Sequence, residues 1–402
     1  MKKNNLLVIS GLIVLVFIIF ISGKRSTVSA DIKDFSFVAG ANIFIDVNDR
    51  YNKIRAEDIH NRFERLHKRG IFNGTYLYAE NGRVVCEGAF GYSDFRSKDP
   101  LDVNSEFQLA SVSKMFTAYA IMLLHQEGKL QYDDTITRFI PEFPYPSVTI
   151  RQLLTHRSGL SRYMSLADQH WNINTPINNE QVIDLFVKYK PSPYFTPDNG
   201  FHYCNTNYAL LASVVERISG EHFDVYMRDH VFNPLGMKNS FVYNLRGDSV
   251  INHSISAGVP GYYIRGRRIR QAGDYYLNGV MGDKGVYSTV EDLYKFNRAL
   301  ETGGQISLSE LEEAYKKGSP DYRGRKDNYG FGWRLKDDMD STAYHFGWWK
   351  GFRSYFVRDM ANQRTLIVLT NTHSGASSTV YWDMLNDETR NFKLAEIYQS
   401  LN

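Results

Sequence analysis

The sequence has little cysteine, no metal-binding pattern and almost no excess of charge. Its 402 residues include only Cys86 and Cys204, too few for a disulfide scaffold, although a single bridge between them is left open. The 11 histidines and these cysteines form no HExxH or paired CxxC pattern. The 47 basic and 44 acidic residues give a net charge of +3, and no basic run is interleaved with aromatics. We therefore expect no metal, no cofactor and no nucleic-acid partner.

The chain also lacks internal repeats and low-complexity segments. Its composition of 43% hydrophobic and 23% charged residues is that of an ordinary globular protein. The length allows two or three domains, but a single mixed domain of this size can also bury a large core. The oligomeric state is left open by the sequence.

The N-terminus carries the pattern of an export signal. Two lysines precede an almost entirely apolar run from Leu6 to Gly23. The small residues at 28–30 are typical of a cleavage site, but two basic residues separate them from the run. Residues 1–24 are therefore either a removed signal peptide or a retained membrane anchor. In both cases we expect the rest of the chain in the periplasm or at the outer face of the cytoplasmic membrane.

The folded domain is expected to span residues 56–402, after a polar linker over residues 25–55. Helical spacing begins at Ala56 and continues to Arg69. Two strand patterns follow, over 72–78 and 83–90, and the Asn81-Gly82 pair between them is typical of a hairpin turn.

The remaining elements predict a mixed fold. Residues from Ser111 to Gln126 are apolar on nearly every face, which predicts a helix at the centre of the domain, ended by Gly128. Residues 130–275 show mainly helix and loop signals. Strand and helix patterns return near the end of the chain, over 344–349, 352–358, 365–370 and 380–401. We expect an α/β fold of the α+β type, in which both chain ends complete an antiparallel sheet flanked by helices and the helical region 130–275 is inserted.

The main catalytic candidate is an SxxK pattern, Ser111 to Lys114, at the start of the central helix. Residues three apart share a helix face, so the hydroxyl and the amine can meet. Ser111 lies in the positive field of the helix N-terminus, and burial favours a neutral Lys114 amine that accepts the serine proton. The alternative to catalysis is that Ser111 only caps the helix and that Lys114 is a solvated or snorkelling side chain. A charged side chain on a buried helix is unfavourable without a role, which supports the catalytic interpretation.

Two weaker patterns accompany this one. Tyr203 and Asn205 form a YxN triplet just before a predicted helix, where a phenol beside a cationic lysine suits proton transfer and an amide suits positioning. His345 and Gly347 form an HxG pattern on a predicted strand, followed by Trp348. Taken alone, His345 is more typical of a structural histidine than of a catalytic one. A glycine within a strand indicates the close approach of another backbone or a ligand. The strand edge could bind substrate, and one of its N–H groups could complete an oxyanion hole with that of Ser111.

The order and spacing of these three motifs resemble those of the penicillin-recognising serine enzymes. That family includes class C β-lactamases, D,D-peptidases and related esterases. Three further segments are similar to the family: LLTHRSGL at 153–160, NPLGM at 233–237 and GDKGVYSTVEDLYKF at 282–296. The resemblance covers roughly residues 56–372.

The resemblance implies a serine hydrolase that acts on a small molecule or a peptide. Ser111 would form an acyl-enzyme, with Lys114 and Tyr203 handling the proton. Asn205 would orient the substrate and Lys114, and His345 would replace the basic residue of the third motif. The N–H groups of Ser111 and Trp348 would form the oxyanion hole.

The third motif departs from the family pattern at one position. The family usually has Thr or Ser between the first and last residues of this motif, whereas this chain has Phe346. In the family that hydroxyl helps to bind a substrate carboxylate, so its loss favours a more apolar substrate over a β-lactam. The alternative function is a catalytically silent, membrane-tethered sensor or binding protein of the same fold.

Overall fold

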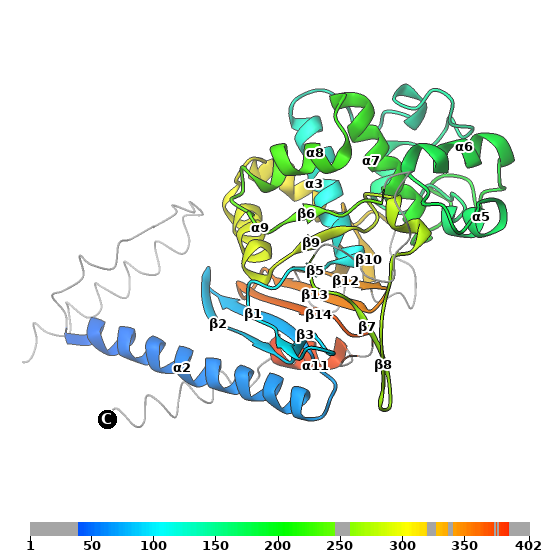
Figure 1. Ribbon diagram of the computed structural model, residues 1–402. Coiled ribbons are helices and arrows are strands. Elements are labelled where there is room, and N and C mark those ends of the chain that lie inside the picture. Colours follow the sequence, from blue (N-terminus) through cyan, green and yellow to red (C-terminus); the bar gives the residue numbers. More distant parts are fainter. Residues whose placement is uncertain are drawn as a thin grey trace, which may run out of the picture.

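A seven-stranded antiparallel sheet forms the centre of the molecule in the computed structural model, which describes residues 39–245, 258–319, 327–336, 341–373, 375 and 378–385. The strand order is β10-β11-β12-β13-β14-β1-β2 (Figure 1). The strands are β1 (Gly74–Glu80), β2 (Arg83–Phe90), β10 (Asp327–Tyr329), β11 (Arg334–Lys336), β12 (Thr342–Trp349), β13 (Phe352–Asp359) and β14 (Arg364–Thr370). Because β1 pairs with β14, strands from both ends of the chain complete the sheet, which confirms the predicted fold.

One face of the sheet is covered by α2 (Ala39–Lys68) and α11 (Ser378–Leu385). Ile59, Phe63 and Leu66 are buried against this face, as their spacing predicts. The expectation of a linker up to residue 55 is wrong from residue 39 onward, because that stretch is the first half of α2. No glycine or proline interrupts the helix between Ala41 and Lys68. Burial of Tyr51 holds part of this half in place.

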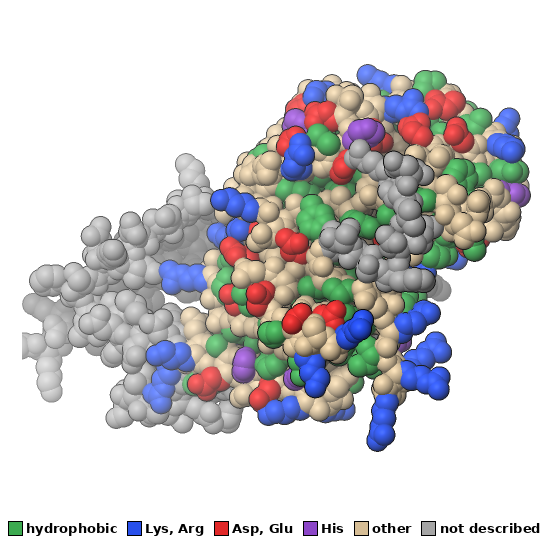
Figure 2. All heavy atoms as spheres, viewed as in Figure 1, with side chains coloured by type: hydrophobic (Ala, Val, Ile, Leu, Met, Phe, Trp, Pro, Cys, Tyr) green, Lys and Arg blue, Asp and Glu red, His purple; other side chains and the backbone are tan. Residues whose placement is uncertain are grey.

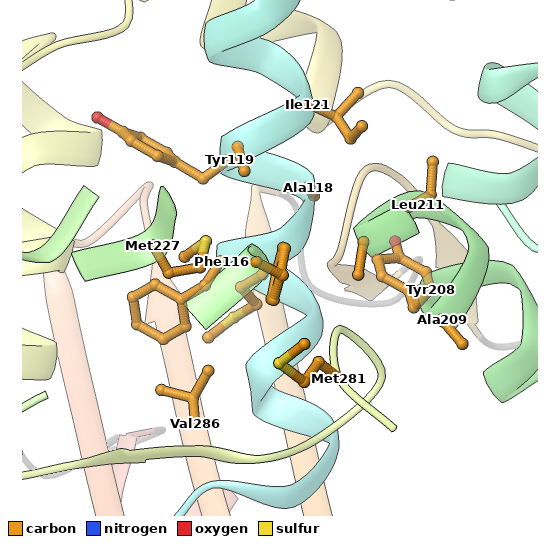
Figure 3. Packing of buried hydrophobic residues seen from close by; sticks show 14 of the residues in the cluster. Phe116, Ala118, Tyr119, Ile121, Tyr208, Ala209, Leu211, Met227, Met281 and Val286 are labelled. Carbon is orange, nitrogen blue, oxygen red and sulfur yellow. The ribbon is translucent and has the colours of Figure 1, made fainter. Parts of the chain in front are cut away.

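The opposite face packs on α3 (Ser113–Gln126) and α9 (Val290–Thr302). Every residue of α3 from Ser113 to Leu124 is buried, so its stability comes from packing on all sides. Figure 3 shows its apolar side chains directed toward several surrounding segments. Gly128, with a φ of +72°, follows the helix and allows the chain to turn away, as predicted.

The helical region lies beyond α3 (Figure 1). It contains α4 (Ile150–Leu154), α5 (Tyr163–His170), α6 (Asn179–Tyr189), α7 (Asn205–Ser219) and α8 (Phe223–Tyr226), and α10 (Leu308–Ala314) follows α9. Capping boxes at Thr149 and Asn178 begin α4 and α6. The helix predicted just after the YxN triplet is α7, which already begins at Asn205.

Several short strands lie outside the central sheet. They are β3 (Tyr92–Asp94) paired with β4 (Asp99–Pro100), β5 (Phe107–Gln108) and β6 (Phe241–Val242) paired with β9 (Val286–Ser288), and β7 (Tyr262–Arg265) paired with β8 (Arg268–Gln271). The last pair and β6 fall in the region expected to be mainly helical. They differ from that expectation because each strand is only two to four residues long, too short for a clear alternation of polar and apolar positions.

Both chain ends lie partly outside the described residues. The apolar run at 6–23 is among them, so the predicted export signal stays a prediction, as does the helix expected beyond Leu385. Within the ranges described, no helix is both long and apolar enough to span a bilayer.

Candidate active site

Ser111 lies in a short 3₁₀ turn, Ala110–Val112, that leads directly into α3. Ala110 has a φ of +49°, a left-handed conformation that is unfavourable for a residue with a side chain. Main-chain and side-chain contacts hold the turn in place. The Leu109 N–H donates to the Val286 carbonyl at 2.8 Å, and the Ser354 hydroxyl donates to the Leu109 carbonyl at 2.5 Å. A strained, tightly fixed turn beside a hydroxyl suits a nucleophile that must hold one position.

Lys114 is fully buried on α3, and its amine reaches Ser111. Its Nζ lies 2.8 Å from Asn205 Oδ1 and 2.7 Å from the Asp283 main-chain oxygen. It lies 3.3 Å from Ser111 Oγ. Two of these partners are carbonyl oxygens, which only accept, whereas the serine hydroxyl can also donate. The two carbonyl oxygens therefore fix the amine, and its contact with Ser111 is the one through which a proton can be exchanged.

The YxN residues lie beside this pair. Asn205 is the first residue of α7, and its carbonyl oxygen holds Lys114. The Tyr203 ring centroid lies 5.1 Å from Lys114 Nζ. The Tyr203 hydroxyl is buried and has no hydrogen-bond partner among the described residues. A buried polar atom without a protein partner is unusual, and here it adjoins the nucleophile, where a substrate group could supply the partner.

A buried charged cluster that the sequence did not indicate lies behind Lys114. Asp283 and Lys284 form an ion pair with 3.2 Å between Nζ and Oδ1. Tyr163 donates a hydrogen bond to the second carboxylate oxygen of Asp283 at 3.0 Å. Burial lowers the pKa of Lys284, while Asp283 opposes this shift and Lys114 adds to it. The segment 282–296 is similar to the family as a whole, but no sequence pattern singled out Asp283 and Lys284 within it.

The strand β12 passes close to the nucleophile turn because residue 347 is glycine. A Cβ at Gly347 would lie 2.1 Å from the Leu109 carbonyl oxygen and 2.2 Å from Ser354 Oγ. The sequence predicted such an approach of backbones, and the structure has it. Beyond Gly347, the Trp348 side chain is 60% exposed.

An open cavity of about 370 Å³ adjoins Ser111. Ser111 and Tyr203 line it together with three aromatic residues, two arginines and one glycine of the sheet. These are Phe346, Trp348, Tyr355, Arg334, Arg353 and Gly347. Phe346 packs against Tyr355 with ring centroids 4.8 Å apart, so it forms an apolar wall at the position where the family has a hydroxyl.

His345 does not line this cavity, which corrects its expected role as a substrate-binding cation. Its side chain is 1% exposed. Its Nδ1 contacts the Phe346 carbonyl at 2.9 Å and its Nε2 contacts the Tyr329 hydroxyl at 2.9 Å. Burial lowers the pKa of His345 well below its ordinary range, with further contributions from Arg334 and Lys114. The ring is therefore neutral, with Nδ1 as the donor and Nε2 as the acceptor.

Two arginines supply the positive charge at the cavity instead. Arg334, on β11, lies over the Tyr203 ring with its Cζ 4.9 Å from the centroid. Arg353, on β13, has a buried Nε without a hydrogen-bond partner among the described residues. No sequence signal identified either arginine, because each is a single basic residue on a strand and belongs to no motif.

The buried histidines predict a loss of stability in acid. His345 and His156 both have a pKa lowered well below 6.5 by burial. Below pH 6.5 the unfolded chain binds protons that the folded chain excludes, so each histidine should remove about 1.4 kcal/mol of unfolding free energy per pH unit. Urea unfolding at pH 7.5, 6.5 and 5.5 measures this effect. His345→Gln should be less stable at pH 7.5, but its unfolding free energy should fall less steeply as the pH is lowered. His222→Gln, an exposed control, should show the same dependence of unfolding free energy on pH as the wild type. Equal slopes in all three proteins would contradict the assignment.

Neither metal nor disulfide chemistry is indicated around Ser111. Among the described residues no three His, Cys, Asp or Glu side chains form a metal-binding group. Cys86 and Cys204 are both free thiols, on β2 and just before α7. The bridge that the sequence left open is therefore absent.

Comparison with known proteins identifies the family. A family model described as "Beta-lactamase" matches residues 59–390. Penicillin-binding protein 4* of Bacillus subtilis (strain 168) is 36% identical over 317 residues, which are 77% of this chain and 70% of the relative. The solved structure of a penicillin binding protein from Bacillus halodurans has a TM-score of 0.69 at 25% identity, covering 81% of this chain and 96% of that one.

A D-amino acid amidase from Ochrobactrum anthropi SV3 has the same fold, with a TM-score of 0.65 at 23% identity over 88% of this chain and 99% of that one. The family resemblance drawn from the Ser111, Tyr203 and His345 motifs is thus confirmed. The chain belongs to the β-lactamase family and is a serine hydrolase of that family.

Proposed function

We propose that this protein is an exported serine hydrolase that forms an acyl-enzyme at Ser111 and cleaves an ester or amide bond. The observation that carries the proposal is the setting of Lys114. Two carbonyl oxygens hold its buried amine, and the third direction faces Ser111 Oγ at 3.3 Å. Export rests on the N-terminal pattern of two lysines and an apolar run.

In the first half-reaction, Ser111 Oγ attacks the carbonyl carbon of the substrate. The Ser111 proton passes to Lys114 Nζ, and Tyr203, whose hydroxyl has no protein partner in the described chain, relays a proton to the leaving group. The bond between the carbonyl carbon and the leaving nitrogen or oxygen then breaks. The N–H groups of Ser111 and Trp348 stabilise the oxyanion.

In the second half-reaction, water attacks the acyl-enzyme, and the same residues transfer protons in the opposite direction. Water loses a proton to the Lys114–Tyr203 pair, the acid product leaves, and Ser111 regains its proton. Asn205 keeps Lys114 in place through both steps.

The cavity favours a substrate with an apolar part and an anionic part. Phe346 and Trp348 offer aromatic surface, while Arg334 and Arg353 offer positive charge at the same cavity. The relatives named above include a penicillin-binding protein and a D-amino acid amidase. Because Phe346 stands where the family has a hydroxyl for the carboxylate of a β-lactam, we favour a small amide, peptide or ester over a β-lactam as the substrate.

Covalent labelling tests the proposal on the full chain. A fluorophosphonate should label the wild type and increase its mass at Ser111, and Ser111→Ala should lose both labelling and turnover of short esters and D-amino acid amides. Ser309→Ala, an exposed serine, is the matched control and should label normally. A fluorescent penicillin used in parallel reports β-lactam recognition. If neither probe labels Ser111, the catalytically silent binding protein replaces the hydrolase. N-terminal sequencing of the exported chain shows whether the signal is removed.

A further inference from the structure

The hairpin of β7 and β8 carries a concentration of positive charge outside the cavity that adjoins Ser111. Four of its residues are arginines within a span of six, and all four are exposed: Arg265, Arg267, Arg268 and Arg270. Within the described part of the chain none of them forms an ion pair with a carboxylate. The hairpin projects from the body of the molecule, and Figure 2 shows basic side chains gathered over it. For a chain of net charge +3, this is a strong local excess.

The strand register separates this hairpin into two different faces. The pairs are Tyr263 with Arg270, Ile264 with Ile269, and Arg265 with Arg268. Directly paired residues point to the same side, and successive residues alternate between sides. One face therefore carries Tyr263, Arg265, Arg268 and Arg270, whereas the other carries the two isoleucines. We call the first set the basic face.

A cavity of about 560 Å³ continues the basic face toward β12. Tyr263 and Arg270 line it from the hairpin, and Lys350 lines it from the turn after β12. The Lys350 Nζ lies 3.3 Å from the centroid of the Tyr275 ring. One carboxylate, Asp274, also lines the cavity, and the Tyr243 hydroxyl donates a hydrogen bond to it at 2.8 Å.

The positive charges in this region repel one another in the free protein. Burial lowers the pKa of Lys350, Asp168 opposes that shift, and Arg270 adds to it. An anion bound between Arg270 and Lys350 would relieve this repulsion and form charge-assisted hydrogen bonds. The exposed arginines further out would then meet the next charges of a longer ligand.

We propose that the basic face and the adjoining cavity are a binding site for a linear polyanion that bears phosphate or carboxylate groups. Lys350 follows Trp348 by two residues, so a chain bound here lies next to the end of the cavity beside Ser111. The site does not depend on the proposed hydrolysis, because none of its residues lines that cavity.

A polymer fits these observations better than a membrane surface. A membrane-inserting hairpin would direct its apolar and basic residues toward the same plane. Here Ile264 and Ile269 lie on the side opposite to the basic face. The concave cavity between Arg270 and Lys350 also suits a chain more than a flat bilayer.

Binding of fluorescent inorganic polyphosphate to the full chain tests this site. The triple variant Arg265→Gln/Arg268→Gln/Arg270→Gln should bind at least about tenfold more weakly and with a smaller dependence on salt. The control Lys68→Gln/Lys129→Gln/Lys316→Gln removes the same charge from exposed positions elsewhere and should bind like the wild type. Fluorophosphonate labelling of Ser111 should be unchanged in both variants, which separates this site from the proposed function.

Three results would overturn the proposal. The first is no binding of polyphosphate by the wild type, and the second is equal weakening in the two triple variants, which would indicate net charge alone. The third is binding to phosphatidylglycerol vesicles that Ile264→Ser/Ile269→Ser abolishes, with polyphosphate unbound, which would identify a membrane surface.

Discussion

Lys114→Met should lower the rate of fluorophosphonate labelling at Ser111, and of ester turnover, by roughly 10²- to 10⁴-fold. Methionine fills a similar volume and suits the apolar surroundings of α3, so the helix should stay packed. The variant loses the only amine that lies within reach of Ser111 Oγ among the described residues, at 3.3 Å. The serine would then be an ordinary alcohol without a base. Stopped-flow or gel-based labelling rates at one pH measure the effect.

Two comparison variants make this result specific. Lys129→Met changes an exposed lysine shortly after the same helix and should label at the parent rate. Tyr203→Phe removes a hydroxyl that has no partner in the described structure, so it should lower the rate without lowering the unfolding free energy. A Lys114→Met protein that is folded and still labels at the wild-type rate would show that another group activates Ser111.

Most of the sheet was predictable because five of its strands are seven or eight residues long and rich in β-branched or aromatic residues. The Asn81-Gly82 turn and the three C-terminal strand patterns placed both chain ends in one antiparallel sheet, and the pairing of β1 with β14 confirms it. The first half of α2 was missed because polar residues are interspersed among its apolar ones. Its position depends on tertiary contacts, such as Arg55, whose Cζ lies 5.0 Å from the Tyr78 ring centroid, and no local periodicity reports those contacts.

The candidate site was predictable where residue type and helical spacing carry the chemistry. Ser111 and Lys114 share a face of one helix start, and the order of the three motifs then indicates Asn205 and Tyr203. For His345, only the family resemblance implied substrate binding; taken alone it favoured the structural role that its burial now fits, and alternation along a strand does not tell which side faces the cavity. Arg334 and the Asp283–Lys284 pair were missed because such residues acquire a role only when distant segments meet.

Gly347→Ala should disable the site by separating β12 from the nucleophile turn. The added Cβ would lie 2.1 Å from the Leu109 carbonyl oxygen, which is main chain and cannot move without shifting the turn before Ser111. We expect a destabilisation of about 1–3 kcal/mol. A shift of about 1 Å at the strand should lower turnover by roughly 10²-fold, because it would displace the Trp348 N–H from the oxyanion position that we propose for it.

A matched substitution separates this contact from a general effect of alanine. Gly375→Ala introduces a Cβ whose nearest neighbour among the described residues, Arg353 Cδ, is 3.6 Å away, an ordinary contact, and should change neither stability nor turnover. Urea unfolding and ester hydrolysis on both variants and the wild type provide the comparison. If Gly347→Ala retained full turnover, the close approach of β12 to Leu109 would not be needed for catalysis. If it lost stability but retained turnover per folded molecule, the glycine would serve packing alone. Loss of both is expected, because the same main-chain contact positions the strand and the turn that carries Ser111.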